Sequence, residues 1–248
     1  MMTIPVAGMP ANARAKVFIL TGSGISAESG VRTYRGDLGL WEEHRVADVA
    51  TPEGFKADPN RVRGFYDARY ADIAKAAPNA AHEALARLEA HPAFDVTLVT
   101  QNIDDLHERA GSRNIIHIHG TVTRAVCGKC GNRMDAHAGW LSSAPPCPSC
   151  GGGLRPDITW FGEMPQRMDE IEKAFMAARI FLMIGTSGEV MPAGDYARRA
   201  RNRKLKRVEF NLATTDVSYH FREWRRGPAS LTLPTYVDGV IRDVEADA

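Results

Sequence analysis

Five short apolar runs that alternate with helical patterns constrain the fold of this chain more than any other feature. The runs are KVFILTG, FDVTLVTQN, IIHIHG, IFLMIGTS and RVEFNL. Each is short enough to be a buried strand, and most are followed by small or polar residues. Helical segments lie between them, so we predict an α/β fold with a doubly wound, Rossmann-like parallel sheet.

Two of the intervening segments have the periodicity of amphipathic helices. They are NAAHEALARLEA and RMDEIEKAFMAAR. Apolar residues in each fall on one helical face, which is expected to cover the sheet. The residues assigned to these faces are Ala81, Leu85 and Leu88 in the first helix, and Ile171, Phe175 and Met176 in the second.

Two other segments interrupt the alternation. One is rich in charged and aromatic residues without a convincing strand, and the other holds all four cysteines among Gly, Pro and Ser. We expect them to form a smaller lobe over one end of the sheet. The expected division is a single domain over 16–248, with a larger lobe of about 16–36, 78–120 and 158–248, a smaller lobe of about 37–77 (helical) and 121–157 (zinc ribbon), and an N-terminal extension over 1–15.

The overall composition is ordinary for a globular protein. It is 44% hydrophobic and 25% charged with a net charge of +1, so no global field directs the chain to nucleic acid or to a membrane. The first residues lack the pattern of a signal peptide, and no apolar run approaches the roughly 20 residues of a membrane span. We therefore expect a cytoplasmic protein.

A loop of small residues follows the first apolar run directly. It reads Gly22-Ser23-Gly24-Ile25-Ser26-Ala27, which matches the G-x-G-x-x-A pattern of dinucleotide pyrophosphate sites. Glycines allow backbone N–H groups to approach phosphate, and the N-terminus of the following helix faces the anion. The loop therefore predicts a dinucleotide site, without identifying the nucleotide.

The cysteines form two C-x-x-C pairs, Cys127 with Cys130 and Cys147 with Cys150, with 16 residues between the pairs. This spacing is that of a zinc ribbon, in which four thiolates close a tetrahedron and leave no open position. The pattern predicts structural Zn²⁺. A redox dithiol, or four unrelated buried cysteines, is the alternative.

Polar residues follow two further strands, in TQNIDDLHERAG and IIHIHG. Gln101, Asn102, Asp104 and His119 are therefore expected near the carboxyl ends of parallel strands, where open α/β sheets bind ligands. Asn and Asp together offer a donor and an acceptor to a carboxamide such as nicotinamide. His119 has the chemistry of a general base near neutral pH.

Each of these residues also has a structural alternative. His117 and His119 point the same way on a strand, so one of them could be a core histidine with satisfied hydrogen bonds. Asp104 or Asp105 could cap the short helix that DLHERAG indicates.

Taken together, the motifs resemble those of the sirtuin family of NAD-dependent protein deacylases. The motifs are GSGISAESGVRTYRG, TQNIDDLHERAG, HIHG, the two C-x-x-C pairs, RPDITWFGEMP, GTSGEVMPAG and EFNL, in order from about Lys16 onward. GLWEEHRVADVATPEGF resembles in particular the bacterial branch that includes desuccinylating enzymes. The chain departs from the usual pattern in having Ser23 in the glycine loop and Tyr34 before the arginine.

The resemblance implies a set of NAD contacts. His119 would be the catalytic base. The residues that would contact NAD are Gly22, Ser23, Gly24, Ile25, Ser26, Ala27, Tyr34, Arg35, Trp41, Gln101, Asn102, Ile103, Asp104, Gly185, Thr186, Ser187, Asn211, Leu212, Ala213 and Ala229.

The resemblance also implies the substrate and the reaction. Residues Trp160, Phe161, Gly162 and Glu163 would pair with an acyl-lysine peptide as an added strand. The acyl oxygen would displace nicotinamide from NAD, a ribose hydroxyl activated through His119 would attack the adduct, and water would release lysine and O-acyl-ADP-ribose. The implied partners are therefore acylated-lysine proteins and NAD, with the chain acting as a monomer.

The motif Tyr66-x-x-Arg69 bears on which acyl group is removed. On a helix, this spacing presents a phenol and a guanidinium side by side, a pair suited to the terminal carboxylate of succinyl- or malonyl-lysine. In the sirtuins that the chain resembles, this motif marks desuccinylases and demalonylases. The alternative is that Tyr66 packs in the core and Arg69 is solvated, with acetyl-lysine as the main substrate.

Three other functions compete with this interpretation. A dehydrogenase would use the glycine loop with an acid at Glu42 or Glu43, although VRTYRGDLGLW is not an amphipathic helix. A zinc ribbon with the basic stretch RRARNRKLKR could bind nucleic acid, although we expect that stretch to be the solvated face of a helix. ADP-ribosyl transfer to protein would use the same NAD pocket.

Overall fold

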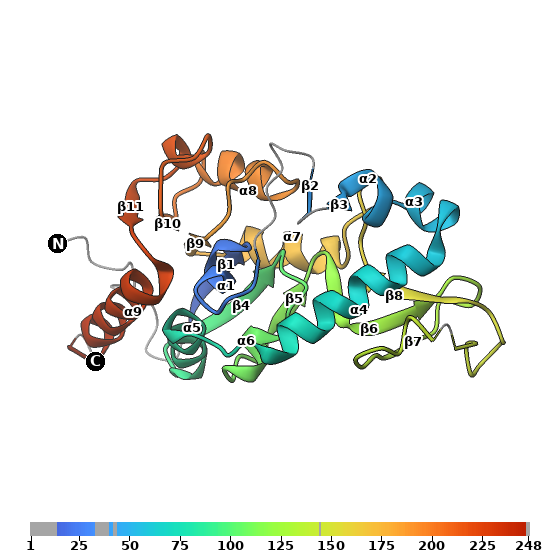
Figure 1. Ribbon diagram of the computed structural model, residues 1–248. Coiled ribbons are helices and arrows are strands. Elements are labelled where there is room, and N and C mark those ends of the chain that lie inside the picture. Colours follow the sequence, from blue (N-terminus) through green and yellow to red (C-terminus); the bar gives the residue numbers. More distant parts are fainter. Residues whose placement is uncertain (1–13, 33–39, 42–43, 144, 247–248) are drawn as a thin grey trace.

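The computed structural model describes residues 14–32, 40–41, 44–143 and 145–246. Figure 1 shows an elongated molecule, with a helix-covered sheet toward one end and the antiparallel strands β6, β7 and β8 at the other. Helix α4 runs along the face of the second part. None of the helices in the described ranges is long and apolar enough to cross a membrane.

The larger sheet has six strands in the order β11-β10-β9-β1-β4-β5, and every neighbouring pair is parallel. This confirms the predicted doubly wound parallel sheet, and all five apolar runs are strands of it. The strands are β1 (Ala15–Thr21), β4 (Phe94–Thr100), β5 (Ile115–His117), β9 (Ile180–Ile184), β10 (Lys206–Asn211) and β11 (Glu223–Arg226).

Alternate residues of β1 enter two different cores, because successive side chains of a strand point to opposite faces. Val17 and Ile19 pack with α5 (Ala80–Ala90) and α9 (Ala229–Ala246) on one face. Phe18 and Leu20 pack with α7 (Met168–Ala177) and α8 (Ala193–Ala200) on the other. A central strand that is buried on both faces has a continuous apolar sequence.

The helical faces are nearly as predicted. Ala81, Leu85 and Leu88 of α5 and Ile171 and Phe175 of α7 are all buried. The prediction for Met176 was wrong, since this side chain is 55% exposed. It lies five positions after Ile171, which turns it by about 140° from that residue at 3.6 residues per turn.

The rest of the chain forms helices and a ribbon that share a third apolar core. Strands β6 (Gly120–Cys127), β7 (Arg133–Asp135) and β8 (Leu154–Ile158) pair antiparallel in the order β7-β6-β8. Helix α4 (Pro59–Lys75) packs on β6 and β8. The other helices of this part are α2 (Val46–Val49) and α3 (Pro52–Ala57).

Several short elements were not predicted. They are the antiparallel pair β2 (Leu40–Trp41) and β3 (His44–Arg45), the 3₁₀ helix η2 (Ser218–His220), and β11. The helix predicted at the glycine loop is the short α1 (Gly24–Ala27). Strand β11 has the sequence EWRR, which carries no apolar alternation. Strand β11 lies at the edge of the sheet. Its outer side remains in contact with water, so charged side chains are tolerated there. The lobe boundaries given above remain a prediction.

The basic stretch over 198–207 is built into the fold to a greater extent than expected. Arg207 is only 5% exposed, and its guanidinium donates to the carbonyls of His220, Ala200 and Arg203. Arg199 pairs with Glu172 of α7. Much of this stretch is therefore packed against the sheet and its helices, and its description as a solvated helix face was incomplete.

Two loops at the carboxyl ends of β1 and β9 approach each other closely. The Gly24 N–H donates to the Gly185 carbonyl at 2.8 Å, and the Gly22 N–H donates to the Ile184 carbonyl at 2.9 Å. A Cβ at Gly185 would lie 2.5 Å from the backbone nitrogen of Ile25, and Gly185 has φ +62°. Only glycine fits this position without strain.

We therefore expect Gly185→Ala to lower the free energy of unfolding by roughly 2–4 kcal/mol, because it combines a left-handed conformation with overpacking. Gly30→Ala is the matched control, since Gly30 has φ +84° with open space around it. It should cost only about 1–2 kcal/mol. Urea unfolding measures both variants, and equal losses would contradict the close-approach argument.

Candidate active site

The carboxyl ends of the parallel strands open onto a cavity of ≈ 630 Å³. Its wall includes residues of the large sheet's loops, of α4 and of the segment after β8. The predicted site residues that line it are Gly22, Ser23, Ser26, Tyr66, Arg69, Gln101, Asn102, Ile103, Asp104, His119, Trp160, Phe161, Gly162, Glu163, Thr186 and Ser187. The fold thus brings together segments from almost the whole length of the chain.

The hydroxyl of Ser26 is the centre of a buried hydrogen-bond network. It donates to Asp104 Oδ2 at 2.9 Å and accepts from Asn102 Nδ2 at 3.1 Å. Asn102 also donates to the Gly22 carbonyl at 3.2 Å. The network therefore joins the loop after β1 to the loop after β4.

Asp104 is only 3% exposed. Burial raises the pKa of its carboxyl, while hydrogen bonds from the Leu106 N–H and the Ser26 hydroxyl oppose this shift. Its Oδ1 accepts from the Leu106 N–H at 3.2 Å, at the start of α6 (Leu106–Arg109). Asp104 therefore supports the helix start, as one alternative suggested, and also faces the cavity.

His117 is the last residue of β5 and His119 follows it two positions later. The two histidines have different roles. His117 Nδ1 lies 3.1 Å from the Asn102 carbonyl, and its Nε2 lies 2.7 Å from Glu108 Oε1. Both partners are acceptors, so the protonated ring, with a proton on each nitrogen, satisfies both contacts. Although burial lowers the pKa of His117, the bond and charge of Glu108 raise it above its usual value. His117 is therefore the histidine with satisfied structural bonds.

His119 lines the cavity. Its Nδ1 lies 3.1 Å from the Gln101 carbonyl, which can only accept, so Nδ1 carries the proton. In the neutral ring, Nε2 then holds the lone pair that a general base needs. Burial lowers the pKa of His119, opposed by hydrogen bonds to the backbone of Gln101 and Met191, and this shift favours the neutral ring.

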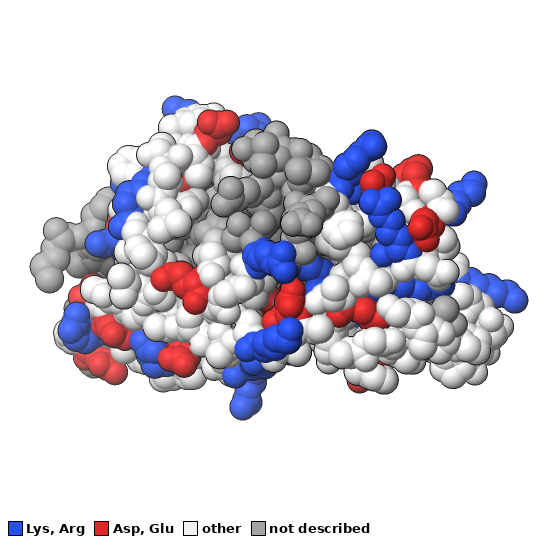
Figure 2. Space-filling view, viewed as in Figure 1, with Lys and Arg blue, Asp and Glu red and all other residues white. Residues whose placement is uncertain are grey.

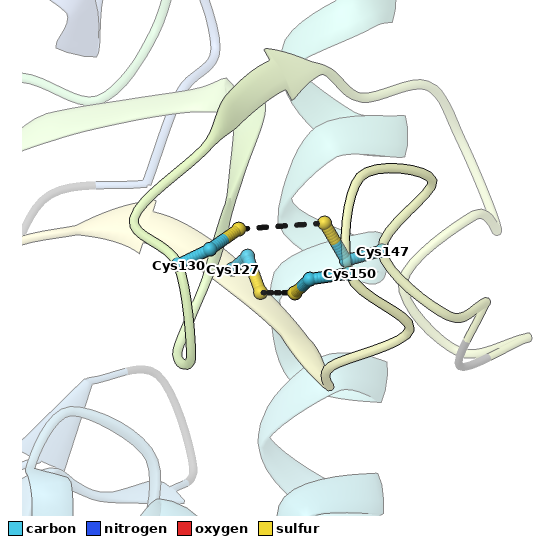
Figure 3. Close-up of side chains that lie close together, drawn as sticks. All are labelled: Cys127, Cys130, Cys147 and Cys150. Atoms are coloured by element: carbon cyan, nitrogen blue, oxygen red, sulfur yellow. Dashed lines mark hydrogen bonds between the residues drawn. The ribbon is translucent and has the colours of Figure 1, made fainter.

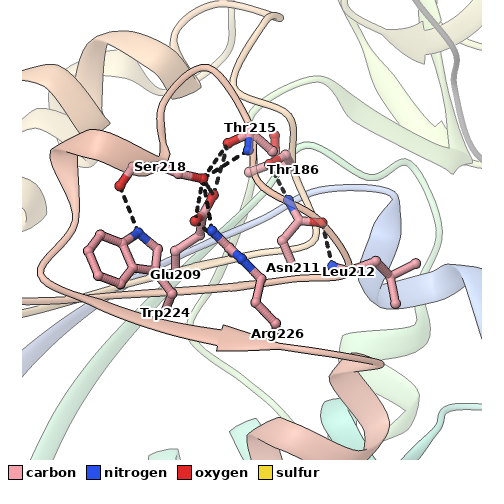
Figure 4. Close-up of polar contacts among 8 residues, drawn as sticks. All are labelled: Thr186, Glu209, Asn211, Leu212, Thr215, Ser218, Trp224 and Arg226. Atoms are coloured by element: carbon pink, nitrogen blue, oxygen red, sulfur yellow. Dashed lines mark hydrogen bonds and ion pairs between the residues drawn. The ribbon is translucent and has the colours of Figure 1, made fainter.

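Thr186 and Asn211 link the loops after β9 and β10. Gln101 Nε2 donates to Thr186 Oγ1 at 3.0 Å, and Asn211 Nδ2 donates to the Thr186 carbonyl at 3.0 Å. Figure 4 shows the Asn211 amide directed at Thr186. Leu212, by contrast, is 70% exposed.

A buried carboxylate holds the chain that follows Asn211. Glu209 is 0% exposed and accepts from Thr215 Oγ1 at 2.9 Å, from Ser218 Oγ, and from Arg226 Nη1 at 2.9 Å (Figure 4). Trp224 Nε1 donates to the Ser218 carbonyl at 2.8 Å. The sequence offered no signal for this cluster, because its members are brought together by the β10–β11 pairing.

At the other end of the cavity, Tyr66 and Arg69 of α4 are 0% and 3% exposed. Arg69 Nη2 donates to the Arg32 carbonyl at 3.3 Å, and Tyr66 Oη accepts from Trp160 Nε1 at 3.1 Å. The alternative was therefore right that Tyr66 packs in the core and wrong that Arg69 is solvated. Both residues also line the cavity.

Some predicted site residues lie elsewhere or are not described. Ile25 and Ala229 belong to the core under the sheet, and Gly24 and Gly185 contact each other. Tyr34, Arg35 and the side chain of Trp41 lie outside the described residues. The contacts of these residues, and of Ala27 and Ala213, with NAD remain predictions.

The cavity also has lining residues that the sequence analysis did not single out. The signal for most of them was present, because they fall inside quoted motifs: Val31 and Arg32 in GSGISAESGVRTYRG, Ala50 in GLWEEHRVADVATPEGF, Ile158, Thr159 and Pro165 in RPDITWFGEMP, and Glu189, Val190 and Met191 in GTSGEVMPAG. Ile73 falls in none of these motifs. The fold alone shows that all of them share one wall.

The four cysteine sulfurs lie together at the ribbon's end (Figure 3), all within 4.8 Å of one another. Cys127 Sγ is 3.6 Å from Cys150 Sγ, and Cys130 Sγ is 3.8 Å from Cys147 Sγ. A tetrahedral zinc ion with Zn–S bonds of about 2.3 Å requires S···S distances of about 3.8 Å. The cluster therefore fits structural Zn²⁺ with all four positions filled.

The chain around the cysteines supports this geometry. Gly131 and Gly151, which follow the second cysteine of each pair, both have φ +71°. The Lys129 N–H approaches Cys127 Sγ at 3.4 Å, as in knuckles that stabilise thiolates.

Figure 2 shows basic and acidic side chains interspersed over the visible face of the molecule.

Comparisons with known proteins agree with this site. Residues 22–192 match the model of the Sir2 family. An NAD-dependent protein deacylase of Bdellovibrio bacteriovorus is 49% identical over 228 residues, which cover 89% of this chain and 94% of the relative. One of Escherichia coli strain K12 is 46% identical over 240 residues, covering 94% and 85%.

A solved Sir2 homologue mutant in complex with ADP-ribose has a TM-score of 0.87 and 36% identity, covering 94% of this chain and 95% of that one. The chain belongs to the Sir2, or sirtuin, family, as its motifs predicted. The glycine loop is therefore that of a Sir2-family protein and not that of a hydride-transfer dehydrogenase.

We expect the purified protein to contain one zinc ion per chain and Cys147→Ser to contain none. Because binding free energy at a structural zinc site contributes to folding, the variant should lose more than about 3 kcal/mol of stability. Elemental analysis and thermal unfolding measure the two effects. Ser149→Ala, in the same turn, is the control that should retain zinc, and a zinc-free but equally stable Cys147→Ser would contradict a structural role.

Proposed function

We propose that the chain is an NAD-dependent protein-lysine deacylase that favours acidic acyl groups, succinyl and malonyl, and also accepts acetyl. The observation that carries this is the placement of His119, with Nε2 as acceptor, in one cavity with the Gly22 loop and with Tyr66 and Arg69. A base, a dinucleotide loop and a carboxylate-binding pair thus share one space.

The residues of the chain divide the work between them. NAD, when bound, supplies the ribose carbon that the acyl oxygen attacks and the hydroxyl that takes over the acyl group. His119 Nε2 would accept the proton of that hydroxyl, while the Gln101 carbonyl holds the ring by its Nδ1 proton. The network of Ser26, Asn102 and Asp104 would fix the nicotinamide end.

The acidic acyl preference is supported by the surroundings of Arg69. Its side chain is almost fully buried at the wall of the cavity, and a guanidinium makes charge-assisted, bidentate hydrogen bonds to a carboxylate. Succinyl and malonyl groups bring such an anion, and an acetyl group does not. Residues Trp160, Phe161, Gly162 and Glu163 line the same cavity and would pair with the peptide backbone.

The finer assignments belong to the same proposal. We propose that the protein acts as a monomer in the cytoplasm on acylated-lysine proteins. ADP-ribosyl transfer would use the same NAD pocket, and detection of ADP-ribose on a protein without deacylated lysine would favour it. A predominantly acetyl-specific enzyme is the other alternative.

The test is mass spectrometry of matched succinyl- and acetyl-lysine peptides, with and without NAD, in which peptide product and nicotinamide are both measured. We expect Arg69→Met to lower kcat/KM for the succinyl peptide about 10- to 100-fold, because it removes charge-assisted hydrogen bonds. Acetyl turnover should change less than about threefold.

Arg61→Met is the matched control on the same helix, since Arg61 pairs with Asp48 at the surface at 3.1 Å. It should leave both rates unchanged. His119→Ala should abolish deacylation of both peptides while the zinc content stays normal. Equal losses on both peptides in Arg69→Met would refute the acidic acyl preference, and nicotinamide-free turnover would refute the mechanism.

The pH dependence follows from the buried imidazole. Burial lowers the pKa of His119 from its usual 6.5, so the ring loses its basic lone pair only when the pH falls below that value. The acid limb of kcat for deacylated peptide should therefore have its midpoint below 6.5. An acid limb centred above pH 7 would contradict His119 as a neutral base.

A further inference from the structure

The indole of Trp160 makes a buried hydrogen bond to the phenol of Tyr66. The donor Nε1 lies 3.1 Å from Tyr66 Oη, and the two residues are 3% and 0% exposed. They are 94 positions apart in sequence, so this bond exists only because α4 packs beside the segment that follows β8. Both residues line the cavity, together with Arg69 one turn along α4.

The chemistry of this bond defines the direction of the phenol. An indole N–H can donate but cannot accept, whereas a phenol does both. Tyr66 Oη therefore accepts from Trp160, and its own proton is directed away from the indole toward a different acceptor. Burial raises the pKa of Tyr66, so the phenol keeps this proton at any physiological pH.

Trp160 is itself held on several sides. The Arg155 guanidinium lies over its ring at 4.2 Å, and Arg155 Nη2 is bound to Glu163 Oε1 at 2.9 Å. The other oxygen of Glu163 accepts from the Trp160 backbone N–H at 2.9 Å. A cation over an indole face is attracted to the ring, so this arrangement restrains the ring that carries the donor.

We propose that Trp160 is a positioning residue for acyl selectivity, whose indole N–H orients the Tyr66 hydroxyl to donate to the terminal carboxylate of an acidic acyl-lysine. This inference rests on the proposed preference for acidic acyl groups. Trp160 thereby has a role through Tyr66 that differs from backbone pairing with the peptide. Glu163 serves the same role through Arg155.

The proposal separates the two substrate classes. An acyl carboxylate would accept from both Tyr66 and Arg69, and it would benefit from a phenol whose proton the indole bond keeps directed away from Trp160. An acetyl group ends in a methyl group that accepts nothing. Loss of the indole N–H should therefore lower succinyl turnover more than acetyl turnover.

The experiment is a double-mutant cycle with Trp160→Phe, Tyr66→Phe and the double variant, with kcat/KM measured on succinyl and acetyl peptides. We expect Trp160→Phe to lower the succinyl-to-acetyl ratio about five- to tenfold, the effect of one buried hydrogen bond. It should act through KM more than kcat. In the Tyr66→Phe background, the Trp160→Phe change should have no further effect, because the shared interaction is already gone.

Phe55→Leu is the matched control for packing. The Phe55 ring lies 5.2 Å from the Trp160 ring, so this change loosens the same contact and leaves the N–H in place. It should lower kcat/KM equally for both peptides or for neither. If Trp160→Phe also lowers kcat/KM equally for both peptides, Trp160 is a packing residue and the proposal is wrong. The same conclusion follows if the effect of Trp160→Phe adds fully to that of Tyr66→Phe.

A second measurement does not require the Trp160 variant to fold. The indole ¹H–¹⁵N signal of Trp160 should move upfield and exchange faster in Tyr66→Phe than in the unmodified protein. An unchanged signal would overturn the inference. If the unmodified protein shows no succinyl preference and Tyr66→Phe changes nothing, the acidic acyl preference itself fails; if Tyr66→Phe abolishes the preference and Trp160→Phe does not, only the role of Trp160 fails.

Discussion

The parallel pairing of β1 with β4 and β9 is the constraint on which the rest of the structure depends. Parallel strands place their carboxyl ends at one edge of the sheet, so the loops that begin at Gly22, Gln101 and Gly185 meet there. The glycines lie at this contact: the Gly22 N–H donates to the carbonyl of Ile184, the last residue of β9, and the Gly24 N–H donates to that of Gly185 in the loop that follows. The glycine loop therefore joins the carboxyl ends of β1 and β9, and it also lines the cavity.

The second part of the molecule completes the cavity from the other side. The zinc cluster holds the two turns of the ribbon together, and the ribbon strands β6 and β8 pack on α4. Helix α4 in turn presents Tyr66 and Arg69 to the cavity. None of the four cysteines lines the cavity, so a metal ion held by them would act on the chemistry only through the position of this helix.

Hydrogen-bond direction distinguishes residues of the same type at this site. His117 has an acceptor beside each ring nitrogen, which favours its protonated form, whereas the Gln101 carbonyl beside His119 Nδ1 leaves Nε2 as the basic nitrogen of the neutral ring. The same reasoning separates the phenol of Tyr66 from an ordinary core tyrosine. In each case the partner, and not the residue type, decides the chemistry.

The sequence by itself determined the class of fold, the metal ligands and most of the cavity's wall. These are local signals: apolar runs, C-x-x-C spacing, and small or polar residues directly after strands. The tertiary structure alone decided which histidine is structural, that Arg69 is buried, and that Trp160 donates to Tyr66. It also brought Glu209 to Arg226 and exposed Met176. Such contacts join residues far apart in the chain, and their energies depend on burial and partner geometry, which no local pattern encodes.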